Sequence, residues 1–317
     1  MKVIVTGSSG YIGGQTALVL QEQGHEVIGV DIRKPPVHLE SVFTECIVDN
    51  FAGNQVFDLI RKNPSVSIVH CAGTSLVGPS QQIPAAYYEN NFVNTKRLLD
   101  HIVTLGATKT IRIVFSSTAA VYGEPVMTPC QEEDPVWPIS PYGESKLMVE
   151  MMMQSYFRAY GLQPVIFRYF NACGADPQGR HGQEPGGTHI IARVLESLRD
   201  DKEFMLYGTD YSTADGTCVR DYIHVNDIAQ AHVLALNSNI STGIYNLGSN
   251  QGFSNREIIA QAEAITGKKL RIIESAPRAG DPAELTASST RFDSIAGNWK
   301  HYTLEDMICH AWAWVNV

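Results

Sequence analysis

The sequence predicts an α/β fold, a doubly wound parallel sheet of the Rossmann type followed by a smaller mixed α/β C-terminal lobe. Short apolar runs alternate with helical patterns over the first half of the chain, as in βαβ units. A glycine-rich turn joins the first such run to the first helical pattern. Residues 171–187 then form a long loop rich in Gly and Pro. We therefore expect one domain over 1–170 and a second over 171–317, with some later segments returning to the first.

Each element follows from its apolar period and its flanking residues. Proline at position 141 is well placed in the first turn of a helix. Three helices are predicted, at Gly10–Gln23, Pro84–Leu105 and Pro141–Tyr160. Strands are predicted at Lys2–Thr6, His25–Val30, Cys46–Val48, Val66–His70, Ile111–Ser116 and Pro164–Tyr169.

A composition of 44% hydrophobic and 18% charged residues over 317 residues is typical of an ordinary soluble globular protein. A net charge of −9 argues against a nucleic-acid partner. The six cysteines (46, 71, 130, 173, 218 and 309) show no paired spacing, so we expect reduced thiols and no metal site. The chain opens on a predicted strand, without a signal peptide, and no apolar run approaches membrane length. A cytoplasmic location without membrane contact is expected.

The first turn has the glycine spacing of a dinucleotide site. Gly7, Gly10 and Gly13 follow the first strand and open the first helix, where the backbone N–H groups of Tyr11 and Ile12 can face a pyrophosphate. Asp31 ends the second strand, where a carboxylate suits the adenosine ribose diol and repels a 2′-phosphate. The prediction is NAD, although the nearby Arg33 could accept the phosphate of NADP.

Tyr142 and Lys146 lie four residues apart at the start of a predicted helix, so they share one helical face. A cation beside a phenol lowers the pKa of the phenol and can make it a general base for an alcohol. The cluster Ser116, Ser117 and Thr118 ends a strand where a hydroxyl can bond a reacting oxygen. Taken singly, the pair could decorate a solvated face, and the cluster could be a simple turn.

With these residues in place, the sequence resembles the extended short-chain dehydrogenase/reductase superfamily and, within it, is similar to the UDP-glucose (UDP-galactose) 4-epimerase family. The similarity spans nearly the whole chain. The superfamily is marked by Val5–Gly13, His70–Gly73, Ser116–Gly123 and Pro141–Lys146. The 4-epimerases are marked more specifically by Arg168–Asn171 and Asp215–Val225, with further matches at Tyr245–Gly248 and Arg278–Asp281.

The resemblance implies epimerisation at C4 of a UDP-hexose through a transient 4-keto sugar. Tyr142 would take the proton of the 4-hydroxyl, Lys146 would hold the nicotinamide ribose and depress the pKa of Tyr142, and Thr118 would bond the reacting oxygen. Further cofactor contacts are expected from Ala72, Gly73, Asn90, Ser116, Tyr169 and Phe170. Substrate contacts are expected from Thr118, Asn171, His189, Arg220, Arg278 and Asp281. The family expectation for assembly is a homodimer.

Two residues depart from the family pattern. Ser75 stands where a lysine is common near the cofactor, and Leu285 stands at a gate beside the hexose, where residue size separates plain from N-acetylated sugars. A UDP-N-acetylhexosamine or UDP-pentose 4-epimerase therefore stays open, as does a net oxidoreductase or decarboxylase. A 4,6-dehydratase is disfavoured because Ala119 and Ala120 stand where dehydratases carry Asp and Glu. A non-catalytic NAD- or nucleotide-sugar-binding regulator would not need Thr118, Tyr142 and Lys146 together.

Overall fold

The computed structural model describes residues 1–237, 239–277 and 281–316, which form two compact units. The first unit contains residues 1–121 and 138–168 and the described residues of 229–245. The second contains the described residues of 122–137, 169–228 and 246–317. Residues 229–245 thus lie in the first unit, and residues 122–137, which precede the expected boundary at residue 170, lie in the second.

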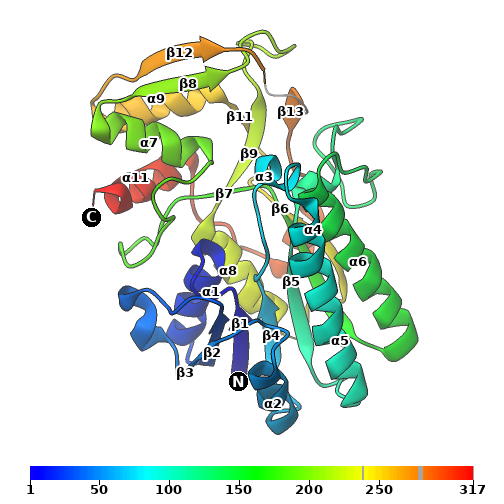
Figure 1. Cartoon of the computed structure of the whole chain (residues 1–317). Coiled ribbons are helices and arrows are strands. Elements are labelled where there is room, and N and C mark those ends of the chain that lie inside the picture. Colours follow the sequence, from blue (N-terminus) through cyan, green and yellow to red (C-terminus); the bar gives the residue numbers. More distant parts are fainter. Residues whose placement is uncertain (238, 278–280, 317) are drawn as a thin grey trace. The chain divides into compact units, whose positions relative to one another are not determined.

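A seven-stranded sheet forms the centre of the first unit, in the order β10-β6-β5-β4-β1-β2-β3. Figure 1 labels six of these strands, β1 to β6. Its strands are β1 (Lys2–Thr6), β2 (Glu26–Asp31), β3 (Glu45–Val48), β4 (Ser67–His70), β5 (Arg112–Thr118), β6 (Gln163–Tyr169) and β10 (Gly243–Leu247). β1 pairs in parallel with both β2 and β4, so the strand order reverses beside β1. Ligands of such sheets bind outside the carboxyl ends of the strands at that point. The six predicted strands are confirmed, with ends that shift by at most two residues.

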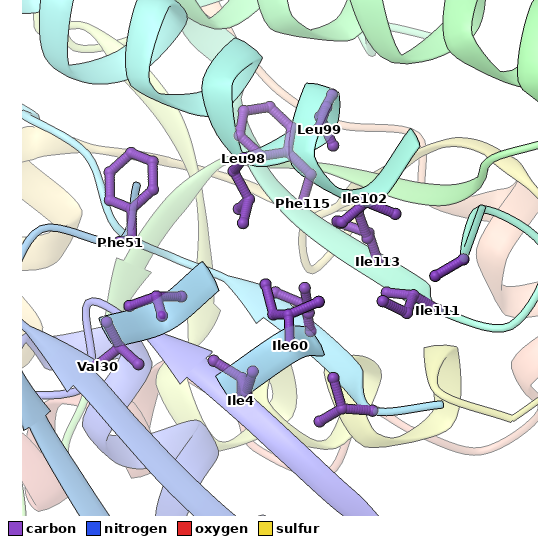
Figure 2. Packing of buried hydrophobic residues seen from close by; sticks show 14 of the residues in the cluster. Ile4, Val30, Phe51, Ile60, Leu98, Leu99, Ile102, Ile111, Ile113 and Phe115 are labelled. Carbon is purple, nitrogen blue, oxygen red and sulfur yellow. The ribbon is translucent and has the colours of Figure 1, made fainter. Parts of the chain in front are cut away.

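The longer helices of this unit are α1 (Tyr11–Glu22), α2 (Asn54–Lys62), α5 (Asn94–Thr104), α6 (Pro141–Tyr160) and α8 (Val225–Ala235), of which α8 begins in the second unit. One apolar face of the sheet packs against α2, α5 and α6. Shorter turns are η1 (Val37–Val42), α3 (Val77–Ser80) and η3 (Ala119–Val121). Figure 2 shows Ile4 and Ile113 of the sheet packing with Ile60 of α2 and Leu98 of α5. Burial of this cluster holds the strand ends, and hence the site, in place.

The predicted helix over 84–105 is helical but not uniform. It consists of α4 (Pro84–Tyr87), a π-helical segment η2 (Tyr88–Val93) and α5. The π segment carries Asn91, whose buried amide donates to the carbonyl of Thr74 and to the hydroxyl of Ser145. π turns of this kind are rare and are frequent at functional sites.

The helix that carries Tyr142 and Lys146 has the predicted bounds, Pro141–Tyr160. Its start is defined by Ser140, whose hydroxyl accepts from the backbone N–H of Gly143, and by proline in the first turn. Its end is defined by Gly161, which has a φ of 73°. These caps fix the helical phase and therefore the face on which both side chains lie.

The second unit is a mixed α/β layer structure, as predicted for the C-terminal lobe. Its strands are β7 (Asn171–Cys173), β8 (Glu203–Tyr207), β9 (Val219–His224), β11 (Gly252–Ser254), β12 (Arg271–Ser275) and β13 (Glu284–Leu285). β9 pairs antiparallel with β11 and parallel with β7 and β13, while β8 pairs parallel with β12. Its helices are α7 (Ile190–Asp200), α9 (Asn255–Thr266), α10 (Thr290–Ala296) and α11 (Leu304–Val315). α7, α9 and α11 share one apolar core.

No helix in the described part of the chain is long and apolar enough to cross a membrane.

Candidate active site

The turn after β1 depends on glycine at two positions, where a Cβ would meet other backbone atoms. Gly7 has a φ of 70°, and a Cβ there would lie 2.8 Å from the backbone nitrogen of Ala72. A Cβ on Gly13 would lie 2.1 Å from the carbonyl oxygen of Gly7. α1 begins at Tyr11, so the N–H groups of its first turn have no acceptor within the helix and face this turn. The arrangement fits the pyrophosphate of a dinucleotide.

Asp31 ends β2 beside the same turn, as predicted. Its Oδ2 accepts from the backbone N–H of Ser9 at 3.0 Å, and its Oδ1 accepts from that of Arg33 at 3.0 Å. Arg33 in turn donates from Nη2 to the carbonyl oxygen of Ser9 at 3.3 Å. The carboxylate is thus fixed at the strand end and can still accept hydrogen bonds from a ribose diol. The residues present fit NAD.

Lys146 is buried at the carboxyl end of β5. It is 5% exposed, and its Nζ donates to the carbonyl oxygen of Ser116 at 2.8 Å. The nitrogen also lies 4.8 Å from the centre of the Phe115 ring. A Cβ on Gly73 would lie 3.2 Å from Nζ, which brings the loop after β4 to the same place. Burial lowers the pKa of Lys146 to about 8, although Cys71 and Glu150 act in the opposite direction.

Tyr142 and Thr118 are brought together as predicted, and a hydrogen bond between their side chains favours the phenolate. Thr118 is oriented by the backbone N–H of Ala120, which donates to its Oγ1 at 3.1 Å. Burial nevertheless raises the pKa of Tyr142 above its ordinary value, and the neighbouring Tyr87 adds to this. The residue keeps some exposure, and solvent moderates the effect.

Without a bound cofactor the pKa of Tyr142 is raised, and the lowering by Lys146 that the resemblance implies for the working site stays a prediction. The ammonium of Lys146 is directed to the Ser116 carbonyl, and it is not among the groups that shift the phenol. Desolvation of the phenolate outweighs the single hydrogen bond from Thr118.

Asn90 lies beside the loop that follows β4, where its Nδ2 donates to Oγ1 of Thr74 at 2.8 Å. Ala72 is held at the start of this loop, because its backbone N–H donates to Oγ1 of Thr6 at 3.2 Å. The loop at Ser75 is held by Tyr87, whose hydroxyl donates to the Ser75 carbonyl at 2.7 Å. The cofactor residues predicted in the first unit therefore surround the carboxyl ends of β1, β4 and β5.

Sequence reasoning missed two residues of this group, Tyr87 and Asn91. The Tyr87 ring meets the Tyr142 ring edge-on, with centroids 6.3 Å apart. Asn91 accepts from the backbone N–H of Thr74 at 2.7 Å. Leu98 and Ile102 lie in the core, and residues three or four positions apart on a helix share a face. Counting back from Leu98 in such steps leads through Thr95 to Asn91 and Tyr87, so the helical period could have identified Asn91 and Tyr87.

The second unit brings Arg220 and Asp281 together. Arg220 is largely buried, with Nη2 3.7 Å from Oδ1 of Asp281, and β13 sets Leu285 in register beside it. Pairing of Arg220 with its neighbour Asp221 is not found. Asp221 is buried and accepts from Ser249, Asn250 and Ala287, and burial raises its pKa to about 6.

Asn171 lies on the strand next to β9, and its Nδ2 donates to the carbonyl oxygen of Asp221 at 2.9 Å. Tyr169 and Phe170 precede it and are 7% and 6% exposed. The Phe170 ring packs near Tyr122, with centroids 6.3 Å apart. Their predicted place beside a nicotinamide stays a prediction.

His189 stands directly before α7 and is exposed at the rim of an apolar cavity of about 220 Å³. That cavity lies between α7, α11 and the loop before α7, with Trp314 as its largest wall residue. The predicted diphosphate contact of His189 stays a prediction. Arg278 lies outside the described residues.

Three comparisons with known proteins agree with one another. Residues 3–248 match the family model of the NAD dependent epimerase/dehydratase family. A UDP-glucose 4-epimerase of Halalkalibacterium halodurans is 44% identical, over 99% of this chain and 95% of that protein.

Two solved structures extend the similarity to three dimensions. A UDP-glucose 4-epimerase of Stenotrophomonas maltophila, solved with NAD and formylated UDP-arabinopyranose, has a TM-score of 0.92 at 31% identity and covers 100% of this chain and 98% of its own. A UDP-glucose 4-epimerase of Brucella ovis in complex with NAD has a TM-score of 0.91 at 36% identity, with 98% and 97% covered.

Proposed function

The chain belongs to the NAD dependent epimerase/dehydratase family, and on this basis we propose that it is an isomerase that epimerises a UDP-hexose at C4, converting UDP-galactose to UDP-glucose with NAD as its cofactor. The observation that carries the proposal is the grouping of Thr118, Tyr142 and Lys146 at the carboxyl end of β5, in the unit that holds the glycine turn and Asp31.

The chain's own residues hold the sugar oxygen and move its proton. Tyr142 takes the proton of the 4-hydroxyl, and Thr118 bonds the same oxygen and stabilises the phenolate. Lys146 holds the nicotinamide ribose and supplies positive charge beside Ser116. NAD, when bound, supplies the hydride acceptor and donor for C4. Tyr169 and Phe170 exclude water from the keto sugar.

The remaining cofactor residues hold the dinucleotide along its length. Gly7, Gly10 and Gly13, with the N–H groups of Tyr11 and Ile12, bind the pyrophosphate, and Asp31 binds the adenosine ribose. The nicotinamide half is held by Ala72, Gly73, Asn90, Ser116 and Lys146. Ser75 stands in place of a lysine and removes one cation from this region, which weakens the hold on NAD. The amount of NAD that stays bound during purification measures this effect.

Binding of the substrate depends on the nucleotide, because the sugar must turn over within the site. Arg220 supplies a forked donor to the diphosphate, and Asn171, His189, Arg278 and Asp281 complete the substrate contacts. Leu285, in register beside Arg220, is of intermediate size, so N-acetylated hexoses and UDP-pentoses are the alternative substrates.

Replacement of Arg220 by leucine is expected to raise KM for the UDP-sugar about 10–100-fold and to change kcat little, because the lost bond to a charged group serves binding. Initial-rate kinetics measure this. Arg256→Leu is the matched control, since this arginine pairs with Glu274 on the surface of the same unit. Equal KM values for wild type and Arg220→Leu would contradict a diphosphate role.

The function itself is tested by incubating purified protein with UDP-galactose and following UDP-glucose by NMR. UDP-N-acetylgalactosamine and UDP-xylose, in parallel, report the alternative substrates. Absence of any C4 interconversion would contradict the proposal. Binding of NAD and UDP-sugars without turnover would instead indicate a non-catalytic binding protein.

The α6 helix exposes two pairs of apolar side chains, and the members of each pair lie three residues apart on one helical face. Met148 and Met151 are 37% and 60% exposed, and Phe157 and Tyr160, which lie on a different face, are 46% and 49% exposed. We propose a homodimer through α6, measurable as sedimentation at twice the mass of one chain. All six cysteines are free thiols, which fits the proposed location in the reducing cytoplasm.

A further inference from the structure

A buried ion pair lies beneath the catalytic group of the first unit. The side chains of Glu150 and Arg168 are 1% and 3% exposed. Arg168 donates from Nη2 to Oε2 of Glu150 at 2.7 Å and from Nε to Oε1 at 3.1 Å. The hydroxyl of Ser117 also donates to Oε1. Buried ion pairs are weak contributors to stability, because desolvation offsets their attraction, so another role for this one is worth seeking.

The pair touches both elements that carry the reacting side chains. Glu150 lies on α6 four residues after Lys146 and eight after Tyr142, on the same helical face. Ser117 lies on β5 between Ser116, which accepts from Lys146, and Thr118, which bonds Tyr142. Arg168 lies on β6, the strand beside β5. One carboxylate therefore joins α6 to the end of β5.

Glu150 also supplies the negative charge near Lys146. The groups around this ammonium are Cys71 and His70 from β4 and its end, Phe115 of β5, and Glu150 of α6. Burial raises the pKa of Cys71 to about 11 and lowers that of His70 to about 3, so both are neutral near pH 7. Among these groups, the carboxylate of Glu150, paired with Arg168, is the one that carries negative charge.

We propose that Glu150 is a positioning residue for the reaction, which holds Thr118 opposite Tyr142 through Ser117 and sets a carboxylate on the helical face that carries Lys146. Arg168 pairs with the carboxylate and orients it. This inference rests on the proposed function, since it assigns a role within the same site. The proposal thus assigns Arg168, the first residue of the block Arg168–Asn171, a role in orienting Glu150 and not in contacting the substrate.

The test replaces Glu150 by glutamine, which keeps the size and a hydrogen-bond acceptor for Ser117 but removes the charge. An opposite charge favours the ammonium, so its loss lowers the pKa of Lys146. The alkaline limb of the kcat–pH profile should move down by about one pH unit, while KM for the UDP-sugar changes less than about twofold. Glu150→Asp, which keeps the charge, should leave the limb at its wild-type pH.

Glu150→Gln leaves Arg168 buried without a counter-charge, which can destabilise the fold by itself. The double variant Glu150→Gln/Arg168→Met removes both charges and should recover thermal stability while the limb stays shifted. If the double variant instead recovered both the thermal stability and the wild-type pH profile, the Glu150–Arg168 pair would have only a structural role, and the proposal would be overturned.

A second readout separates this proposal from the proposed function. The 13Cε resonance of Lys146, identified by its loss in Lys146→Met, is titrated in wild type and in Glu150→Gln. Its midpoint should fall by about one unit in the variant, whether or not the protein turns over a UDP-hexose. An unchanged midpoint overturns the inference. A lowered midpoint in Glu150→Gln, together with a wild type that does not epimerise UDP-hexoses, contradicts only the proposed function.

Discussion

Replacement of Tyr142 by phenylalanine is expected to lower kcat about 10²–10⁴-fold, the usual contribution of a general acid–base group. The variant keeps the ring that packs against Tyr87 and loses only the hydroxyl that bonds Thr118. Binding of the UDP-sugar should change little, because the diphosphate provides most of the affinity. NMR-monitored turnover of UDP-galactose and calorimetric titration with UDP measure the two effects.

The matched control is Tyr156→Phe, on the same helix. The Tyr156 hydroxyl donates to Asp100 outside the site, so its removal should leave kcat within about twofold of wild type. Full activity of Tyr142→Phe, or an equal loss in both variants, would rule out the phenol as the base.

Replacement of Gly13 by alanine is expected to weaken NAD binding about 100-fold or more, since misplacement of a positioning group by about 1 Å already has effects of this size. The new Cβ would lie 2.1 Å from the carbonyl oxygen and 2.8 Å from the carbonyl carbon of Gly7. Both are backbone atoms, so the turn must move as a whole and its N–H groups no longer face the pyrophosphate. Overpacking should also lower the free energy of unfolding by about 1–3 kcal/mol.

Fluorescence titration of cofactor-free protein with NADH measures the affinity, and thermal unfolding measures the stability. Gly78→Ala is the control, because a Cβ at that glycine meets no atom within 4 Å. A Gly13→Ala protein that binds NADH as tightly as wild type would show that the turn does not hold the pyrophosphate.

Local signals were sufficient for the elements that build the site. Alternating apolar runs located the strands, and Ser140, Pro141 and Gly161 define α6 at the predicted residues. The glycine spacing and Asp31 identified the dinucleotide turn, because this motif depends on backbone geometry over a few residues. Proximity of Thr118 to Tyr142 followed from the rule that ligands meet the carboxyl ends of parallel strands.

Features that depend on the tertiary surroundings could not be predicted in the same way. The π-helical turn at Tyr88–Val93 accompanies side-chain bonds from Asn91 to Thr74 and Ser145, which are distant in sequence. The upward pKa shift of Tyr142 depends on burial, for which the Tyr-x-x-x-Lys pattern holds no information. The pairing of Glu150 with Arg168 joins two ordinary charged residues whose burial only the packed sheet shows.

The position of β10 far along the sequence from the other strands of its sheet has a consequence for synthesis of the chain. Its residues, Gly243–Leu247, complete the sheet order beside β6, although the other six strands lie within the first 169 residues. On the ribosome, β6 therefore remains an unpaired sheet edge while some 70 further residues are made, and such edges readily pair with other chains. A nascent chain stalled before β10 emerges should bind holdase chaperones, and one stalled after it should release them.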